Sequence, residues 1–484
     1  MQIPLSSGSY TDVGAEFRTS YPRNLVPVMK NTGISKMFLR AAEGLTRFDV
    51  GAPTLIGSDR GGINWQGTCY RVIGTNFVSV SESGAVTVLG SLPDDGNPVA
   101  ITYGYPNQGI AIVSAKSLWF YTIEKPTGGT NPTPSLQQCT DPNVGEPIDV
   151  LWFGGYFVMS DGTYSYVTQL ANQFTINSQL YGSDSNSPEP LNGHLKFRNE
   201  LYLCNRYTIA VFDNTGGTGY PFTENVGATI QKGVIGPFAK CITSQGFAFL
   251  GSAQGETPSV WLSVGLGIAT KIAAREVEMV IAQYTETELY GTTLEYRAEK
   301  EQQFIYLHLP DYTLVYDVAG SQAAQMPIWF FLDSSADGSG AWRAWHPVYC
   351  YGKFLMGDKI DQRMGFIDFT TAAQYGTAAR WQFDIVFAYN QARGFVVNSA
   401  ELIGTYGRSA LGEQDTMSMQ YTNDGLVWST PRFISMGVQG QTRKRAQWRP
   451  KHFFRNFRGY RFAGNNAAPV SFAALEVTGE PLAS

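Results

Sequence analysis

The sequence predicts an all-β protein, in which a β-propeller is followed by a C-terminal domain resembling a β-sandwich. The first indication is a pair of alternating apolar strands, joined by a polar turn, that recurs along the chain. Residues 155–160 with 164–167 form one copy, and residues 199–204 with 208–212 form another. The second indication is composition, because 10 Trp, 26 Tyr and 29 Phe suit pleated strands and 52 Gly suit tight turns.

The strand pair occurs seven times between residues 51 and 375. Successive copies are separated by 40, 46, 45, 47, 56 and 49 residues. A period of this length with several short strands per unit is typical of a β-propeller, whose units bury their apolar faces against one another. Seven pairs predict seven blades, and six remain possible if the first or last pair belongs to a flanking domain. The copies centre on Val72, Ile112, Val158, Leu203, Leu250, Tyr306 and Leu355.

Three regions are expected along the chain. Residues 1–50 form an N-terminal arm or contribute a strand elsewhere, residues 51–375 form the propeller, and residues 376–484 form a β-rich C-terminal domain. Inside the propeller, the polar stretches 124–147 and 181–190 are interpreted as surface loops. An amphipathic helix is expected at 270–284, as an insertion between blades. Beyond residue 376 the predicted strands are 381–387, 395–397 and 417–421, the last ending in a hairpin turn at 423–425.

Composition also limits the function classes. The net charge of −5 argues against general affinity for nucleic acid, which requires cationic contacts with phosphates. The five cysteines are scattered without a C-x-x-C pair, so neither a zinc site nor a disulfide framework is indicated and reduced thiols are expected. The N-terminus lacks the pattern of a secretory signal, and no apolar run reaches the roughly 20 residues of a membrane helix.

The candidate interaction site is a basic stretch from Arg443 to Arg461 that contains no acidic residue. Arginines alternate there with aromatic residues, as expected of strands with an aromatic inward face and an arginine-rich outward face. Such a face could dock an acidic patch of a partner protein, face solvent, or contact nucleic acid. The candidate interface residues are Arg443, Arg445, Arg449, Arg455, Arg458 and Arg461.

No catalytic, cofactor-binding or metal-binding residues are predicted. The four histidines are far apart in the sequence, and His308, in an alternating strand, is expected to be structural. Residues 422–428 are similar to the Asp-box of sialidases but one residue short, and are interpreted as a hairpin turn. A nucleophile elbow, a P-loop, a metal-binding helix and a paired-carboxylate signature are all missing from the sequence.

Several segments together resemble one family, the tail accessory proteins of short-tailed bacteriophages, also described as packaged-DNA stabilization, tail-nozzle or tail-hub proteins. The resemblance extends over nearly the whole chain in the same order, although Ala210 stands where the family pattern has an acidic residue. The matching segments are 24–27, 60–62, 208–212, 227–233, 308–310, 314–317, 321–322, 357–358 and 422–425, followed by the arginine-rich strands.

This resemblance implies a structural virion protein without enzymatic activity or cofactor, made in the host cytoplasm and located in the viral tail. It implies a homohexameric ring below the portal and its adaptor, the head-to-tail connector. The ring would hold the tail needle or plug, support tailspikes or tail fibres, retain packaged DNA and serve as the conduit for DNA ejection. The alternatives are a propeller glycosidase or lyase that degrades polysaccharide, and a monomeric propeller scaffold.

Overall fold

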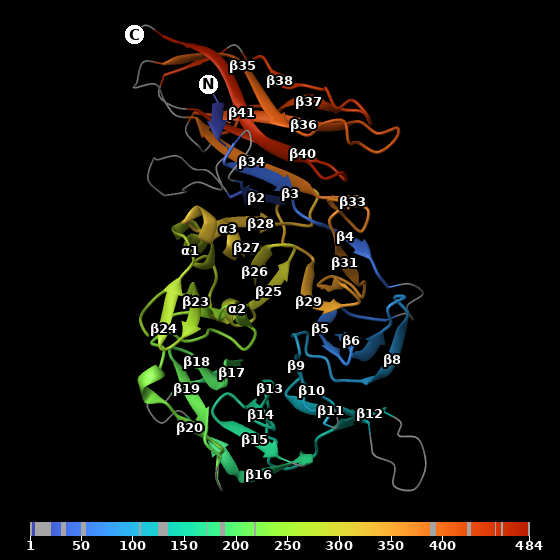
Figure 1. Cartoon of the computed structure of the whole chain (residues 1–484), viewed down its shortest axis with the longest axis vertical. Helices are drawn as coiled ribbons and strands as arrows, with labels where there is room; N and C mark the ends of the chain where they lie inside the picture. The colour runs from blue at the N-terminus through green and yellow to red at the C-terminus, as the bar shows by residue number, and fades with distance from the viewer. Residues whose placement is uncertain are drawn as a thin grey trace.

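The computed structural model confirms the predicted fold class of a β-propeller joined to a β-sandwich (Figure 1). It describes residues 2–4, 21–30, 35–49, 55–105, 108–123, 134–170, 172–183, 189–216, 219–387, 394–423, 427–450, 452–455 and 458–482. Within these ranges the chain forms 41 strands, three short α-helices and one 3-10 turn.

Seven sheets succeed one another around the propeller. Six have four antiparallel strands in sequence order, and the last has six strands, because one N-terminal strand and a later two-stranded hairpin extend its first three strands. Each strand pair recognised in the sequence is centred on the second strand of a sheet. The strands of the first four sheets are β5 (Asp59–Trp65), β6 (Thr68–Ile73), β7 (Asn76–Val80) and β8 (Val86–Ser91); β9 (Ala100–Tyr103), β10 (Ile110–Ser114), β11 (Ser117–Ile123) and β12 (Pro134–Gln138); β13 (Asp149–Phe153), β14 (Tyr156–Ser160), β15 (Ser165–Gln169) and β16 (Asn172–Gly182); and β17 (Leu191–Phe197), β18 (Glu200–Asn205), β19 (Ile209–Asn214) and β20 (Phe222–Glu224).

The chain closes the ring of sheets by returning to its own N-terminal region. Strand β4 pairs antiparallel with β31 in the seventh sheet, and the innermost strand of that sheet, β29, contacts β5 of the first. Chain segments from both ends of the propeller therefore hold one sheet together. The strands of the last three sheets are β21 (Lys240–Ile242), β22 (Phe247–Gly251), β23 (Ser259–Gly265) and β24 (Ile268–Lys271); β25 (Thr293–Glu299), β26 (Gln302–His308), β27 (Thr313–Asp317) and β28 (Trp329–Leu332); and β29 (Ala344–Cys350), β30 (Lys353–Asp358), β31 (Gly365–Asp368), β4 (Gly44–Arg47), β32 (Ala373–Gln374) and β33 (Thr377–Ala378).

The connections differ from the sequence expectations at the predicted helix and in the first polar stretch. The expected helix at 270–284 is shorter: α1 spans Arg275–Ile281, residues 270–271 belong to β24, and a second helix α2 (Glu286–Tyr290) follows with a capping box at Thr285. The polar stretch 124–147 is not only a loop, because it contains β12, which completes its sheet against β11. The predicted turn at 423–425 lies largely outside the described residues. Two further elements on the propeller are η1 (Val226–Ala228) and α3 (Val318–Ala324).

The C-terminal domain consists of two sheets packed face to face. Their inner faces bury a core that includes Trp381, Phe383, Trp448 and Phe462. The N-terminal strands β2 and β3 belong to the first of these sheets, so both chain ends build this domain. The first sheet contains β1 (Gln2–Pro4), β2 (Leu25–Met29), β3 (Met37–Ala41), β35 (Phe395–Gly404), β38 (Ala446–Trp448), β39 (His452–Phe454) and β41 (Ser471–Pro481), and the second contains β34 (Arg380–Phe387), β36 (Asp415–Thr422), β37 (Arg432–Gly437) and β40 (Arg458–Asn465).

Residues before β2 join the two domains. Arg23 forms backbone bridges with both Phe331 of β28 and Gln382 of β34. Its guanidinium also lies 2.7 Å from the buried Asp333 carboxylate. The Asn24 amide donates to the backbone oxygens of Asp333 and Arg380. These interactions satisfy the buried polar groups at the junction of the two domains. The sandwich therefore packs directly against the sixth sheet instead of being joined to it by a linker.

Candidate functional site

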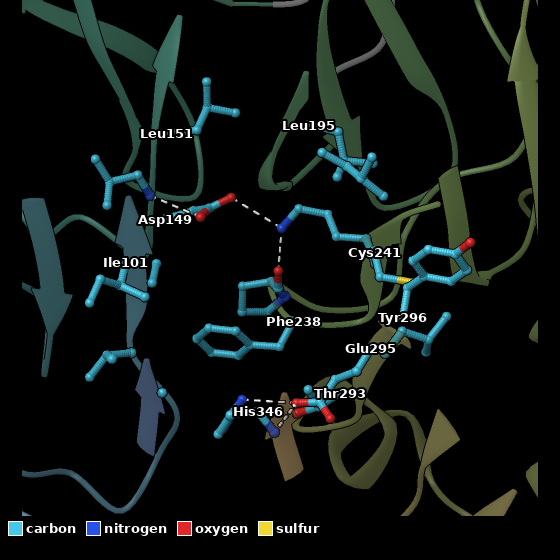
Figure 2. Close-up of a pocket in the computed structure, with 18 of the residues that line it drawn as sticks. Ile101, Asp149, Leu151, Leu195, Phe238, Cys241, Thr293, Glu295, Tyr296 and His346 are labelled. Carbon is cyan, nitrogen blue, oxygen red and sulfur yellow. Dashed lines mark hydrogen bonds and ion pairs between the residues drawn. The ribbon is translucent and has the colours of Figure 1, made fainter. Parts of the chain in front are cut away.

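The central cavity of the propeller is enclosed by the innermost strand of every sheet. It has a volume of about 390 Å³. The seven strands contribute, in order, Gly61, Ile101, Leu151, Leu195, Cys241, Tyr296 and His346 to its wall. Figure 2 shows side chains from these strands facing this cavity.

On one side of the cavity, Asp149 connects three consecutive sheets. Its Oδ2 accepts from the backbone N–H of His194 at 2.7 Å and lies 3.1 Å from Lys240 Nζ. His194 is itself buried, and its Nε2 lies 2.8 Å from Ser165 Oγ. Burial lowers the pKa of His194 to about 4, so its imidazole is neutral at physiological pH.

On the other side, Glu295 connects the sixth and seventh sheets. It accepts from the backbone N–H of His346 at 2.7 Å and lies 2.9 Å from His346 Nδ1 and 3.0 Å from His308 Nε2. Burial alone would raise the pKa of Glu295, but its contacts with His308 and His346 hold it well below its usual range. Burial lowers the pKa of His308 to about 4 and that of Lys359 to about 8. His308 Nδ1 then accepts a hydrogen bond from Lys359 Nζ at 2.8 Å.

The segment at Pro237 and Phe238 closes one end of the cavity. Both residues also line a second cavity of about 230 Å³, which includes Lys116 and Tyr290. In Figure 2, Phe238 is drawn between Asp149 on one side and Glu295 with His346 on the other. The backbone oxygen of Phe238 accepts from Leu294 N–H at 2.9 Å, which holds this segment against the sixth sheet. The segment containing Phe238 therefore lies between the central cavity and the second cavity.

This arrangement is suited to holding the sheets together rather than to catalysis. Asp149 and Glu295 are both occupied by hydrogen-bond donors from neighbouring strands, and no arginine is known to line the cavity. Among the described residues, no group of His, Cys, Asp or Glu has the geometry of a metal site. A propeller glycosidase would need acids and arginines converging on one face, and this cavity does not provide them.

The sequence did not reveal this polar network, because its members come from different repeats. The interval between Glu295 and His346 is 51 residues, and no local motif marks either residue. The only available signal was a charged or histidine residue in the first strand of several copies. The expectation that His308 is structural agrees with its burial and its contacts with Glu295 and Lys359.

The arginines of the predicted interface do not share one outward face. Arg458 is internal, because β40 directs this side chain towards the sandwich core. The residue is only 3% exposed and donates a hydrogen bond to the backbone oxygen of Phe453. Arg461 faces the other side of β40 and forms two hydrogen bonds, of 2.9 and 2.8 Å, with Asp384. Arg445 pairs with Glu401 on the outside of the first sheet. These three arginines already have partners within the chain.

The remaining candidates, Arg443, Arg449 and Arg455, are exposed. They lie before β38, between β38 and β39, and after β39, along a free edge of the first sheet. None of the three has an ion pair with a described residue. Positive charge along an edge strand also discourages pairing with another chain, which is a structural explanation for the same residues. An interface role for these arginines stays a prediction.

The fold and its interior define a two-domain β-propeller and β-sandwich protein, with a polar network that links the sheets around the central cavity of the propeller. The first family model, described as "Bacteriophage P22 Gp10, beta-propeller", matches residues 1–372, and the second, "Bacteriophage P22 Gp10, beta-sandwich", matches residues 380–480. The chain belongs to this Gp10 family. It is 24% identical over 491 residues to the tail hub protein gp10 of Salmonella phage P22, covering 98% of each chain.

Solved propeller structures are much more distant. The WD40 domain of Neurospora crassa Pan2 has a TM-score of 0.40 at 8% identity, covering 64% of this chain and 89% of that chain. The AfRom2 CNH domain has a TM-score of 0.39 at 8% identity, covering 67% of this chain and 99% of that chain. At such TM-scores these likenesses carry no argument about function.

Proposed function

We propose that this protein is a tail hub that forms a six-fold ring below the head-to-tail connector of a bacteriophage. Membership of the Gp10 family makes it a structural component of the virion tail. The single observation that carries this conclusion is the match of both domains, in order, to the two parts of that family. The similarity to the P22 tail hub protein over 98% of each chain supports the same conclusion.

The finer role that we propose is to retain packaged DNA, to hold a tail needle or plug, and to surround the DNA during ejection. In such an assembly the DNA passes between the copies of the protein rather than through a propeller. The central cavity of about 390 Å³ is interrupted by Phe238 and is far too small for a duplex. The overall net charge of −5 supports a conduit that binds DNA weakly.

We further propose that the protein has no enzymatic activity. The two carboxylates of the central cavity are fully engaged in hydrogen bonds between sheets, and the buried histidines are held neutral. Among the described residues, no helix is long and apolar enough to cross a membrane. The portal adaptor, the tail needle and the tailspike or fibre remain the proposed partners.

Arg443, Arg449 and Arg455 are the part of the predicted arginine interface that remains available to a partner. Replacing Arg455 by Glu should weaken incorporation of the protein into tails while leaving its folding unchanged. Lys300→Glu is a matched control, since Lys300 is also an exposed cation but lies in the β25–β26 turn of the propeller. Equal incorporation of the two variants would exclude the β38–β39 edge as a partner interface.

The experiment that tests the proposed function is electron microscopy of this protein mixed with the portal and adaptor assembly from the same phage. A six-fold collar at the lower end of the adaptor is the expected result. The appearance of free monomers only, with no density added to the adaptor, would overturn the hub assignment. Activity on purified surface polysaccharide would then be the assay to perform next.

A further inference from the structure

The hairpin between β23 and β24 carries an apolar tip that costs conformational energy. Gly265 pairs with Ile268, so the loop consists of Leu266 and Gly267 alone. Leu266 has a φ of +60° and Gly267 a φ of +73°, the left-handed combination found in type I′ hairpins. Asn, Asp or Gly are preferred at the first of these positions, and a leucine is unfavourable there.

Among the tight turns of the propeller that the structure describes, Leu266 is the large apolar residue at positive φ. Ala115, at the equivalent position of the β10–β11 turn, is also apolar, but it is small and half-buried. At positive φ in equivalent positions, Gln66, Arg198 and Lys300 are polar and exposed. Tyr351 also has positive φ, but it is partly buried and donates from its hydroxyl to the backbone oxygen of Val80. Leu266 is apolar, and 70% of it is exposed. Neither packing within this chain nor backbone preference accounts for a leucine at this position.

Leu266 belongs to a larger exposed apolar surface. Val264 and Ile268 flank it on the same hairpin and are 43% and 59% exposed. The hairpin tip lies against η1, since a Cβ added to Gly267 would approach the Ala228 oxygen to 3.5 Å. Val226 of η1 is 63% exposed. These four residues form the apolar knob, and a cluster of this kind on a soluble surface is typical of an interaction site.

The sandwich carries an open apolar cavity that could receive such a knob. It has a volume of about 360 Å³, and Phe38, Ile403, Gly404 and Ala473 contribute to its wall at β3, β35 and β41. The exposed Lys30 lies at its edge. Figure 1 shows β24 on the flank of the propeller and β35 and β41 in the sandwich, so the knob and the cavity belong to different parts of the molecule.

The charges of the two domains are complementary. Residues 44–375, which include the propeller strands, contain 18 Lys and Arg against 30 Asp and Glu, whereas residues 1–43 and 376–484, which include the sandwich strands, together contain 17 Lys and Arg against 10 Asp and Glu. An acidic propeller is thus attracted to the basic sandwich of another copy, while like domains repel one another. Charge complementarity and the separation of the two surfaces both favour a heterologous contact, which generates a ring when the rotation between neighbouring copies closes.

We propose that the apolar knob inserts into the sandwich cavity of a second copy of this chain, with Leu266 as its central residue. The inference rests on the ring of the proposed function and assigns the surfaces that build it. Each copy uses its knob on one neighbour and its cavity on the other. Burial of Leu266 in the assembly would offset the conformational energy that its positive φ costs.

The test is sedimentation velocity of the full chain over a range of protein concentrations. Wild type should associate, and Leu266→Asn should shift association to concentrations about tenfold higher or more, because it removes a buried leucine from the contact. The same substitution should not destabilise the monomer, since Asn suits positive φ. Ala115→Asn is the matched control, because Ala115 occupies the equivalent position of the β10–β11 turn with a φ of +46°.

The receiving cavity is tested with Ala473→Glu, which places a charge in its wall, against Thr478→Glu on the exposed part of the same strand. Only the first should prevent association. A wild-type chain that stays monomeric at every concentration, or a Leu266→Asn variant that associates normally, would overturn the proposal. If the Leu266→Asn variant formed a normal six-fold collar on the adaptor, the role of the apolar knob would be refuted and the hub function would stand. If the wild-type protein formed no collar, the hub function itself would be refuted.

Discussion

Arg71 provides the sharpest test of how the propeller ring is closed. The side chain is fully buried in the first sheet, and its Nε and Nη2 lie 2.6 and 3.1 Å from the Asp59 carboxylate. Nη2 also donates to the backbone oxygen of His346 at 2.9 Å. One guanidinium therefore binds the first sheet to the seventh. Burial alone would lower the pKa of Arg71, but Asp59 raises it above its ordinary value, so the guanidinium stays charged.

Replacing Arg71 with Met should lower the free energy of unfolding of the propeller by about 3–5 kcal/mol. The change leaves the Asp59 carboxylate, with a side chain only 1% exposed, as an uncompensated buried charge. It also removes the hydrogen bond that the His346 backbone oxygen accepts from Arg71. Loss of that bond costs about 1–3 kcal/mol, which is part of the total of about 3–5 kcal/mol. The effect is large because the carboxylate and the carbonyl are both buried between the first and seventh sheets.

The assay is denaturant unfolding followed by tryptophan fluorescence, with Asp59→Asn and the double variant measured in parallel. Because the two residues are in contact, the double variant should lose about 1–3 kcal/mol less than the sum of the single losses. Lys116→Met, which removes an exposed ion pair with Glu146, is the control and should unfold like wild type. A loss below about 1 kcal/mol for Arg71→Met would refute the reasoning.

Three further predictions follow from buried and exposed charges. His194 and His308 have folded pKa values of about 4 against an ordinary value of 6.5, so the unfolded chain takes up protons first. Stability is therefore complete above pH 6.5 and falls towards pH 4, by up to about 3 kcal/mol per histidine, and His194→Gln should flatten the profile in thermal unfolding at several pH values. Arg461→Met should destabilise the sandwich by about 1–3 kcal/mol in denaturant unfolding, because it removes the two hydrogen bonds that the buried Asp384 carboxylate accepts from this guanidinium. Arg443→Met should change stability by less than about 0.5 kcal/mol in the same assay, since the side chain is exposed, and a larger loss would show an internal role.

The repeated strand pairs were readable from the sequence because they are local. Alternation over five or six residues reports which face of a strand is buried, and a polar turn reports a hairpin. Every centre of a predicted pair, from Val72 to Leu355, lies on the second strand of its sheet. The same reasoning identified strands in the C-terminal domain, but it overestimated the helix at 270–284 and interpreted β12 as part of a loop.

The arginine stretch shows what alternation along a strand cannot predict. Arg458 and Arg461 lie on one strand, yet one is internal and the other pairs with Asp384 of a strand 77 residues earlier. Sequence alternation assigns side chains to two faces of a strand, but it cannot tell which of those faces a second sheet covers. For that reason only Arg443, Arg449 and Arg455 of the predicted interface remain exposed without a known ion pair.

By itself, the sequence determined a propeller of repeated strand pairs, a second β-rich domain, and the family to which both belong. Only the tertiary structure decided that β2 and β3 enter the sandwich, that β4 completes the seventh sheet, and that Asp149, Lys240, Glu295 and His346 meet around one cavity. Strand pairs within a hairpin are specified by neighbouring residues. Closure of the ring and the polar network inside it depend on hydrogen bonds between residues far apart in the chain, for which no local pattern exists.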